Sequence, residues 1–403
     1  MTSIQRDEEG MRFEKRQISQ SRFIFMLLAL AWSSMQSASA QIEVVGTDAT
    51  LDVATWNIEW FGASYNGPSD DAVQVQNVAD IVLGTGIDLW AVQEIASIPR
   101  TEELLSLLPD KWDMILAESG QQRLGYLYDS DVLSLRSRAH ILTDFNRAFA
   151  TRPPLKAEFE VQLPDTSFIV TVINVHMKAF SDADSYARRV EAAQRVKNHI
   201  DFTSLSSQPV LFMGDFNDKL QSSTHAGLTS PYAPFVNDPQ DYRMLTLPIE
   251  QAGIGTYLGG STIDHIVATD EMADLWVDGS TQVLTRLVTV NGYAVRTSDH
   301  LPVVASFGRV TGTDVEEIPV HSNRNLSLSL YPNPASDRLN VAWDETSNGS
   351  VHVELIDLMG RVVQSTSTTA SDFNIDLTSF SPGLYLVRVQ KGETVTSKVF
   401  IRR

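Results

Sequence analysis

The feature that most constrains the fold of this chain is a short apolar run that ends in polar side chains. Val210 to Met213 are apolar, and Gly214 ends the run. This pattern is typical of a buried strand, and alternate residues of an extended segment point the same way. Asp215 and Asn217 follow one residue apart, so we expect them on one face. A turn rich in Asp and Asn also explains this segment taken alone.

The same arrangement recurs at other predicted strand ends. The polar residues concerned are Asn57 and Glu59, Gln93 and Glu94, Asn174 and His176, Asp264, and Asp299 with His300. Each could be a cap or turn residue. Repetition at several strand ends is poorly explained that way, because sites in α/β folds gather at the tips of strands. The sequence therefore predicts one shared site.

Strand-like and helix-like patterns alternate through the central region. Apolar residues three or four apart predict helices over Asp71–Leu83 and Asp182–Phe202. Residues 221–260 are rich in Gly, Pro, Ser and Thr and predict long loops. The alternation indicates an α/β domain with helices outside its sheets. Further strands are expected at Leu51–Trp56, Ile87–Val92, Leu124–Tyr128, Leu155–Val161, Phe168–Val175, Ile263–Ala268 and Pro302–Phe307, and a short helix at Thr101–Leu108.

The two ends of the chain differ from this central region. Residues 1–40 are expected to be a signal peptide, with basic residues, the apolar run Phe23–Trp32 and the cleavage pattern Ala38–Ala40. The run is too short to span a bilayer comfortably, so no stable membrane span is expected. Translation could start at Met1 or at Met11, and both alternatives stay open. We expect a catalytic domain over 41–310, a linker over 311–325 and a small all-β sandwich over 326–403.

Composition narrows the chemistry. The chain has no cysteine, which excludes disulfides, Cys-ligated zinc and iron–sulfur sites. A net charge of −19 argues against a broad basic face for polyanions, but not against a phosphate site that contains cations. Oxygen ligands suit Mg²⁺ or Mn²⁺, with Ca²⁺ as a further candidate. Such a cation with a His–Asp pair is sufficient to hydrolyse a phosphoester.

Six short motifs occur in an order that resembles the endonuclease/exonuclease/phosphatase superfamily, which includes deoxyribonuclease I, abasic-site endonucleases, neutral sphingomyelinases and inositol-polyphosphate phosphatases. The resemblance covers roughly residues 50–308. It implies a four-layered α/β sandwich, in which two packed mixed sheets lie between helices. The motifs are Trp56–Glu59, Gln93–Glu94, Asn174–His176, Gly214–Asn217, Ile263–His265 and Ser298–His300.

By this resemblance, the cation ligands are Glu94, with Asn57 and Asp299 beside it. The resemblance also implies that His300 is the general base or orients the attacking water. Asp264 would hold the imidazole and favour the imidazolium that develops as the proton is taken.

The resemblance implies a second group of residues that contact the substrate. Asp215 and Asn217 would position water and the scissile phosphate, and His176 would contact the phosphate or the leaving oxygen. Arg152 matches a position that touches backbone phosphate in deoxyribonuclease-like members, although an arginine that caps a proline turn is an alternative. Glu59 is expected to be a partner of the metal ligands rather than a ligand.

Two departures separate the chain from known branches. The inositol-phosphatase branch carries Trp-Cys-Asp-Arg where this chain has Thr262–His265, which argues against that branch. Deoxyribonuclease I carries disulfides, which this chain cannot form. The chain is therefore a close copy of neither.

The tail resembles a type IX secretion C-terminal sorting domain. The resemblance rests on Leu330–Ala335, Ile356–Arg361, Gly383–Arg388 and the terminal Phe400–Arg403. It implies a bacterium with two membranes, contact with the secretion machinery of the outer one, and a secreted or cell-surface protein whose tail is removed. A carbohydrate-binding or adhesive β-module is the alternative.

These observations predict a secreted, monomeric, metal-dependent nuclease that acts on DNA, with RNA left open. The first alternative keeps the site but changes the substrate to a phospholipid head group or a phosphomonoester. A sphingomyelinase-like enzyme would need an apolar docking element, for which the long loop region offers Tyr232, Phe235, Tyr242, Met244 and Leu245, unless they are buried. The second alternative is a surface protein that binds without catalysis.

Overall fold

The computed structural model describes residues 42–118, 120–290, 292–308, 328–343, 350–357, 361–370, 372–381, 383–391 and 394–402. The predicted signal peptide and the predicted linker lie outside these residues, so the domain boundaries stay predictions. Within the described ranges, no helix is long and apolar enough to cross a membrane.

The first of two large sheets is built around two parallel strands. β1 and β2 are parallel, and the remaining neighbours in this sheet are antiparallel. β1 is buried along most of its length because its apolar residues pack on both sides. The six strands, in spatial order, are β11 (Gln282–Val283), β12 (Val303–Phe307), β1 (Leu51–Phe61), β2 (Leu89–Ile95), β4 (Arg123–Asp129) and β3 (Trp112–Leu116).

The second large sheet repeats this plan. β7 and β8 are its parallel pair, and the other neighbours are antiparallel. The apolar run from Val210 lies in β8 and is completely buried, as predicted. The six strands, in spatial order, are β5 (Leu133–His140), β6 (Leu155–Leu163), β7 (Thr166–His176), β8 (Val210–Asp215), β10 (Asp264–Thr269) and β9 (Tyr242–Met244).

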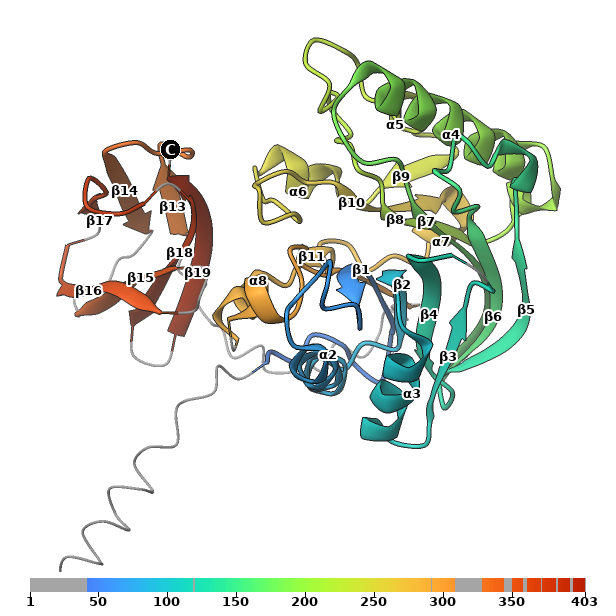
Figure 1. Ribbon diagram of the computed structural model, residues 1–403, viewed down its shortest axis with the longest axis horizontal. Helices are drawn as coiled ribbons and strands as arrows, with labels where there is room; N and C mark the ends of the chain where they lie inside the picture. Colours follow the sequence, from blue (N-terminus) through green and yellow to red (C-terminus); the bar gives the residue numbers. More distant parts are fainter. Residues whose placement is uncertain are drawn as a thin grey trace, which may run out of the picture. The chain divides into compact units, whose positions relative to one another are not determined.

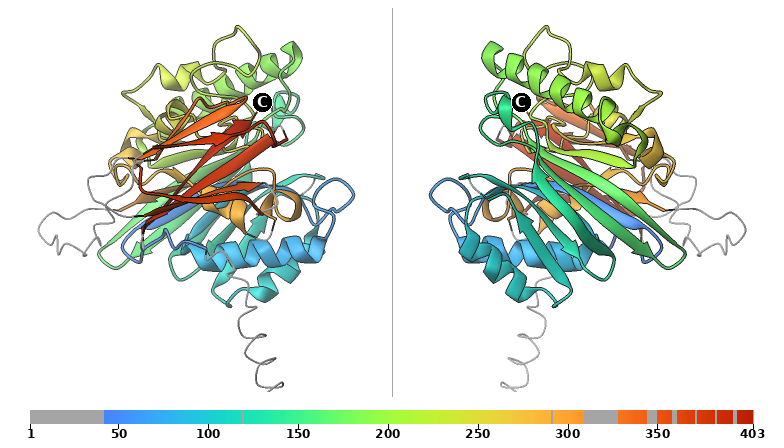
Figure 2. Two further views of the ribbon diagram at one scale, coloured as in Figure 1. Left: turned by 90° about the vertical axis from the view of Figure 1, so that its left-hand side faces the viewer. Right: turned by 90° about the vertical axis from the view of Figure 1, so that its right-hand side faces the viewer.

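Helices cover the outer faces of the two sheets. α2 (Asp71–Thr85) and α3 (Ile98–Leu107) lie against the first sheet, and α4 (Ala183–Asp201) lies against the second (Figures 1 and 2). The arrangement confirms the predicted four-layered α/β sandwich. The shorter helices are η1 (Thr143–Phe145), η2 (Ser204–Ser207), α5 (Ala233–Val236), α6 (Leu247–Gln251), α7 (Asp270–Ala273), η3 (Thr285–Thr289) and α8 (Tyr293–Arg296).

The two sheets are joined by buried polar contacts as well as by apolar packing. Gln93 donates from its Nε2 to Asn174 Oδ1 across 2.8 Å, and Asn174 donates to the Val92 carbonyl across 3.0 Å. The Tyr126 hydroxyl donates to the Leu155 carbonyl of the facing sheet across 2.7 Å. Buried polar groups need such partners. Gln93 and Asn174, two of the predicted strand-end residues, are therefore used to fix one sheet against the other.

The C-terminal part forms two small antiparallel sheets, which confirms the predicted β domain. Apolar residues of both sheets are buried together, among them Leu339, Val353 and Val387. One sheet has the order β13 (Leu328–Tyr331), β14 (Arg338–Trp343) and β17 (Asp372–Asp376). The other has the order β16 (Val362–Thr368), β15 (Val351–Asp357), β18 (Gly383–Lys391) and β19 (Thr394–Arg402).

Candidate active site

The strand pairing explains why distant segments meet at one edge of the sandwich. The parallel pairs β1–β2 and β7–β8 each end together, and β10 begins where β8 ends because the two are antiparallel. The register sets Asp215 opposite His176 on one side and opposite Asp264 on the other. Asn57 of the first sheet donates to Asp215 of the second across 3.0 Å. The predicted strand-end residues thus share one site.

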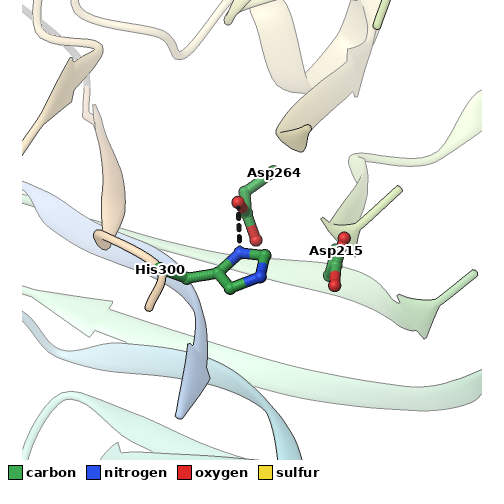
Figure 3. Close-up of side chains that lie close together, drawn as sticks. All are labelled: Asp215, Asp264 and His300. Carbon is green, nitrogen blue, oxygen red and sulfur yellow. Dashed lines mark hydrogen bonds and ion pairs between the residues drawn. The ribbon is translucent and has the colours of Figure 1, made fainter. Parts of the chain in front are cut away.

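A histidine–aspartate pair lies at the centre of this site. His300 Nδ1 is 2.8 Å from Asp264 Oδ2, and the Thr256 hydroxyl donates to the same oxygen across 2.6 Å. Asp215 lies on a different side of the imidazole ring from Asp264 (Figure 3). One ligand atom from each of Asp215, Asp264 and His300 lies within 4.8 Å of the others. His300 therefore has one nitrogen held by Asp264 and the other near Asp215.

The backbone of His300 is fixed from several directions. Its carbonyl accepts from the Trp56 indole across 3.3 Å and from the Tyr293 hydroxyl across 2.5 Å. Its amide donates to the Ser298 hydroxyl across 2.9 Å, and that hydroxyl donates to the Asn57 carbonyl across 2.7 Å. These contacts tie the segment before β12 to β1, which orients the imidazole before any substrate binds.

A second set of contacts surrounds Glu94. The Asn57 amide donates to Glu94 Oε1 across 3.1 Å, and the Trp60 backbone amide donates to Oε2 across 3.0 Å. His176 Nε2 lies 3.6 Å from Glu94 Oε1 and 3.5 Å from Asp215 Oδ2. The carboxylates of Glu94 and Asp215 are thus bridged by an amide and approached by one imidazole.

His176 is buried, and its charge state follows from that. Burial holds its pKa well below the ordinary value, with Arg152 and His300 lowering it further. The ring is therefore neutral at neutral pH. Its Nδ1 is buried with no hydrogen-bond partner among the described residues.

Several site residues have a backbone conformation that side chains rarely adopt. Glu59, Trp60, Glu94 and Asn217 have φ values of 27°, 47°, 64° and 51°. The β1–β2 pairing also shifts register between Asn57 and Phe61. Such strain persists only where surrounding contacts fix it, and it clusters at functional sites. It turns the strand ends so that their side chains face one another.

Negative charge accumulates at the site. Burial, followed by the charges of Asp299 and Glu94, raises the pKa of Glu59 to about 7. Burial raises the pKa of Asp299 against the effect of His300, and Glu94 adds to the rise. Burial also raises the pKa of Asp215 to about 7, although His300 and the Asn57 amide oppose this. Repulsion among carboxylates of this kind is relieved by a bound cation.

The donor set fits a hard divalent cation. Glu59, Glu94 and Asp299 offer carboxylate oxygens that lie close together, since the charges of Asp299 and Glu94 raise the pKa of Glu59 and the charge of Glu94 raises that of Asp299. Asn57 offers an amide oxygen beside them. Oxygen donors of this kind suit Mg²⁺, Mn²⁺ or Ca²⁺. The Glu59 carboxylate lies near those of the predicted ligands, as the effects of Asp299 and Glu94 on its pKa indicate.

Arg152 lies beside the site but is held by protein atoms. Its guanidinium donates to the Met177 carbonyl across 3.2 Å, to the His176 carbonyl across 3.4 Å and to Gln122 Oε1 across 2.7 Å. Burial lowers its pKa, and Glu94 and Asp215 oppose that shift. Arg152 therefore supports the strand end that carries His176.

Asn217 closes the site next to Asp215. Its backbone amide donates to Asp215 Oδ1 across 2.9 Å, and its side-chain amide donates to Asp215 Oδ2 across 3.0 Å and to the Met177 carbonyl across 3.2 Å. The predicted placement of both side chains at the exit of β8 agrees with this geometry.

Some contacts of the site carry no signal in the sequence. Thr256 lies in the long loop region, where nothing marks it as the partner of Asp264. Ser298 and Tyr293 were likewise assigned no role, although both hold His300. The five residues considered as an apolar docking element lie in the core instead. These are Tyr232, Phe235, Tyr242, Met244 and Leu245, all at most 8% exposed.

The comparisons with known families agree with this geometry. Residues 54–300 match the endonuclease/exonuclease/phosphatase family, and the chain belongs to that family, whose enzymes are phosphoesterases and nucleases. Residues 329–402 match the secretion system C-terminal sorting domain. The chain is therefore exported to the cell surface or the medium. No curated protein is similar enough in sequence to count as a relative.

Solved structures with a similar fold include proteins from animals and bacteria. The human Nocturnin catalytic domain is 15% identical over 64% of this chain and 94% of its own, with a TM-score of 0.45. A Bacteroides vulgatus endonuclease/exonuclease/phosphatase is 15% identical over 64% and 98%, with a TM-score of 0.47. The Bacteroides thetaiotaomicron mannosyl-6-phosphatase Bt3783 is 18% identical over 63% and 98%, with a TM-score of 0.43. These similarities carry no assignment of substrate.

Proposed function

We propose that this chain is a secreted, divalent-metal-dependent phosphodiesterase that hydrolyses DNA outside the cell. The observation that supports this most directly is the Asp264–His300 pair, with Asp215 near the second imidazole nitrogen. An oxygen-rich group that includes Glu94 and Asn57 lies beside it. A base, a cation site and phosphate-binding groups around one point would be sufficient to hydrolyse a phosphodiester.

The Asp264–His300 pair activates the attacking water. With Nδ1 held by Asp264, the Nε2 atom of His300 is left to receive a proton. Burial lowers the pKa of His300, but Asp264, Asp215 and Asp299 outweigh it and hold the pKa well above the ordinary value, so the ring is charged at neutral pH when no cation is bound. A bound cation would oppose this rise by neutralising the same carboxylates, which would leave Nε2 free of a proton and able to act as the base. The same carboxylates stabilise the imidazolium as the water oxygen bonds to phosphorus. The phosphorus–oxygen bond to the leaving group breaks, and solvent protonates the leaving oxygen.

The remaining residues position the phosphate. Asn217 and Asp215 orient water and the scissile group at the exit of β8, and neutral His176 contacts a phosphate oxygen or the leaving oxygen. Glu94, Asn57 and Asp299, with Glu59 beside them, hold Mg²⁺ or Mn²⁺, with Ca²⁺ as a further candidate. When bound, the cation neutralises charge on the phosphate oxygens.

The net charge of −19 makes salt dependence a useful test of substrate class. Polyanion binding by Lys and Arg releases counterions, so affinity falls as salt rises. A nuclease with this charge depends on a bound cation and a few local arginines, and its activity on DNA should fall steeply with salt. A single phosphomonoester would show a weaker dependence.

The test is cleavage of supercoiled plasmid by the mature chain with Mg²⁺ or Mn²⁺ and in excess EDTA. Wild type should cleave only with the metal, and His300→Ala should fail in both. RNA, sphingomyelin vesicles and sugar phosphates, assayed in parallel, separate the alternatives. If sphingomyelin or a sugar phosphate is hydrolysed while the plasmid stays uncleaved, that molecule and not DNA is the substrate. Full cleavage of the plasmid in excess EDTA would rule out the metal-dependent mechanism. If no phosphoester is hydrolysed, the chain is a surface protein that binds without catalysis.

A further inference from the structure

A polar pocket lies on the far side of Arg152 from the catalytic residues. Its volume is about 270 Å³. It is formed by the start of β4, the end of β5 and the segment that follows η1. We call it the anion pocket, and its polar lining consists of Gln122, Arg123, His140, Thr143, Asn146, Thr151 and Arg152.

The charge of this lining is unlike that of the rest of the chain. Two arginines and a histidine face the pocket, and no carboxylate lines it among the described residues. The whole chain has 50 acidic and 31 basic residues, so an acid-free pocket with two guanidinium groups is a local reversal of its charge. Hydroxyl and amide groups supply the remaining donors. This chemistry favours an anion over a neutral or cationic ligand.

Both arginines are anchored to the strand ends that carry catalytic residues. Arg152 donates to the backbone carbonyls of His176 and Met177 on one side and to Gln122 in the pocket on the other. Arg123 pairs with Ile95, the residue after Glu94, and donates from Nη1 to the Ala96 carbonyl across 3.3 Å. The pocket is therefore next to the phosphate site, separated from it by Arg152.

One donor of the Arg123 guanidinium has no partner. The Nε atom of Arg123 is buried and makes no hydrogen bond within the described part of the chain. Because Nε is covered by protein atoms, a phosphate in the pocket would contact Arg123 through its terminal amino groups.

The loop that forms the pocket has a strained backbone. Leu142, Ala150 and Thr151 have φ values of 56°, 53° and 64°. The turn is closed by the Thr151 amide, which donates to the Asn146 carbonyl across 2.8 Å. His140 Nδ1 lies 3.1 Å from the Pro153 carbonyl on the opposite rim. Strain maintained in this way is typical of ligand-binding segments.

We propose that the anion pocket binds a second phosphate group of the substrate, adjacent along its backbone to the phosphate that is hydrolysed. The inference rests on the proposed function for the first phosphate. It specifies the substrate class further, because a molecule with two phosphates on neighbouring positions fills both sites at once. DNA meets this condition, and so does a bisphosphorylated sugar.

Two matched pairs of chromogenic substrates test the proposal. Thymidine 5′-(p-nitrophenyl phosphate) is compared with its 3′-phosphate derivative, and thymidine 3′-(p-nitrophenyl phosphate) with its 5′-phosphate derivative. Within each pair only the second phosphate differs. A further arm esterifies the second phosphate with a nucleoside, which distinguishes an internal phosphate of a chain from a terminal one.

In at least one pair, wild type should hydrolyse the substrate with two phosphates with a kcat/KM at least about tenfold higher than the substrate with one. The gain should come from a lower KM, because charge-assisted hydrogen bonds to the second phosphate strengthen binding. In Arg123→Gln this advantage should fall to about twofold or less, while the rate on the one-phosphate substrate stays within about twofold and shows that the variant is folded. Arg123→Lys should retain part of the advantage. Arg136→Gln, an exposed arginine of β5, is the matched control and should retain all of it.

A wild type that hydrolyses both members of each pair equally would overturn the pocket and leave the proposed function standing. An advantage that persists in Arg123→Gln would also overturn it. If no diester is hydrolysed, the proposed function fails instead, and the pocket is decided by calorimetry with thymidine 3′,5′-bisphosphate and thymidine 5′-monophosphate. Tighter binding of the bisphosphate by wild type but not by Arg123→Gln supports the pocket, and equal binding overturns it.

Discussion

The chain contains two Asp–His dipeptides that look alike in sequence and differ completely in structure. Asp264–His265 begins β10, and Asp299–His300 precedes β12. In the first, Asp264 faces the active site and His265 points away from it, as strand alternation requires. In the second, His300 is in the site and Asp299 is on its rim, with 40% of its side chain exposed.

The partners of the two imidazoles explain their different properties. His265 Nδ1 lies 2.8 Å from the Thr246 hydroxyl and Nε2 lies 3.0 Å from the Asp218 carbonyl. With neutral partners at both nitrogens, burial lowers its pKa to about 4. His300 is also buried, but nearby carboxylates hold its pKa well above the ordinary value. Charge around the ring, rather than burial, separates a structural histidine from a reactive one.

The largest expected effect is the difference in activity between variants of these two histidines. His300→Ala should reduce kcat/KM for DNA or a chromogenic diester by about 10³-fold or more, because the group that accepts the proton is lost. His265→Gln should stay within about threefold of wild type, since His265 does not touch the substrate site. Steady-state kinetics of the two variants checks this. Equal losses would show that the two pairs do not differ in role.

The aspartates should differ by how they respond to metal. Asp264→Asn should reduce kcat by about 10²–10³-fold at any Mg²⁺ concentration, because it removes the charge that holds the imidazole. Asp299→Asn should lose about tenfold at low Mg²⁺ and recover at high Mg²⁺, as expected for a weakened cation site. Mg²⁺ titrations of both variants provide the measurement. Recovery of Asp264→Asn at high Mg²⁺ would contradict its assignment.

The order of the effects should reverse for stability. His265→Gln should reduce the free energy of unfolding by about 1–3 kcal/mol, because Thr246 and the Asp218 carbonyl lose a buried partner. With Mg²⁺ bound, His300→Ala should change it by less than about 1 kcal/mol, because the cation replaces the positive charge that His300 supplies to the buried carboxylates. Urea unfolding at pH 7 measures both. A larger loss for His300→Ala would refute the comparison.

The comparison also predicts how stability depends on pH. The pKa of His265 in the folded chain is about 4, below the ordinary value of 6.5, so protons bind the unfolded chain first as pH falls. His265 therefore destabilises the fold progressively from about pH 6.5 to pH 4, by up to about 3 kcal/mol. The stability difference between wild type and His265→Gln should narrow over this range. A constant difference would mean that His265 does not titrate as described.

The segments with strong apolar patterns could be predicted from the sequence. The apolar run from Val210 to Met213 predicted β8, and the helical spacing of apolar residues predicted α2 and α4. Both could be predicted because a regular element with one buried face has apolar residues at a regular spacing. β5 was missed because it is an edge strand whose residues are mostly exposed. Its Ser and Arg residues show no apolar alternation.

The site was predictable only in part, for a similar reason. Residues at the ends of apolar strands, such as Glu94 and His176, could be found because the strands point to them. Thr256 and Arg123 could not, because each comes from a segment without a clear pattern and meets its partners only through tertiary packing. The opposite roles of His265 and His300 were also hidden, since both follow an aspartate.

The central claim is a cation-dependent phosphodiesterase site built on Asp264 and His300. The most direct test is kcat/KM for thymidine 5′-(p-nitrophenyl phosphate) after EDTA treatment, followed over a Mg²⁺ titration in wild type and Glu94→Gln. Wild type should be inactive without metal and regain full activity with it, whereas Glu94→Gln should need about tenfold more Mg²⁺ or higher. Full wild-type activity in excess EDTA would contradict the claim.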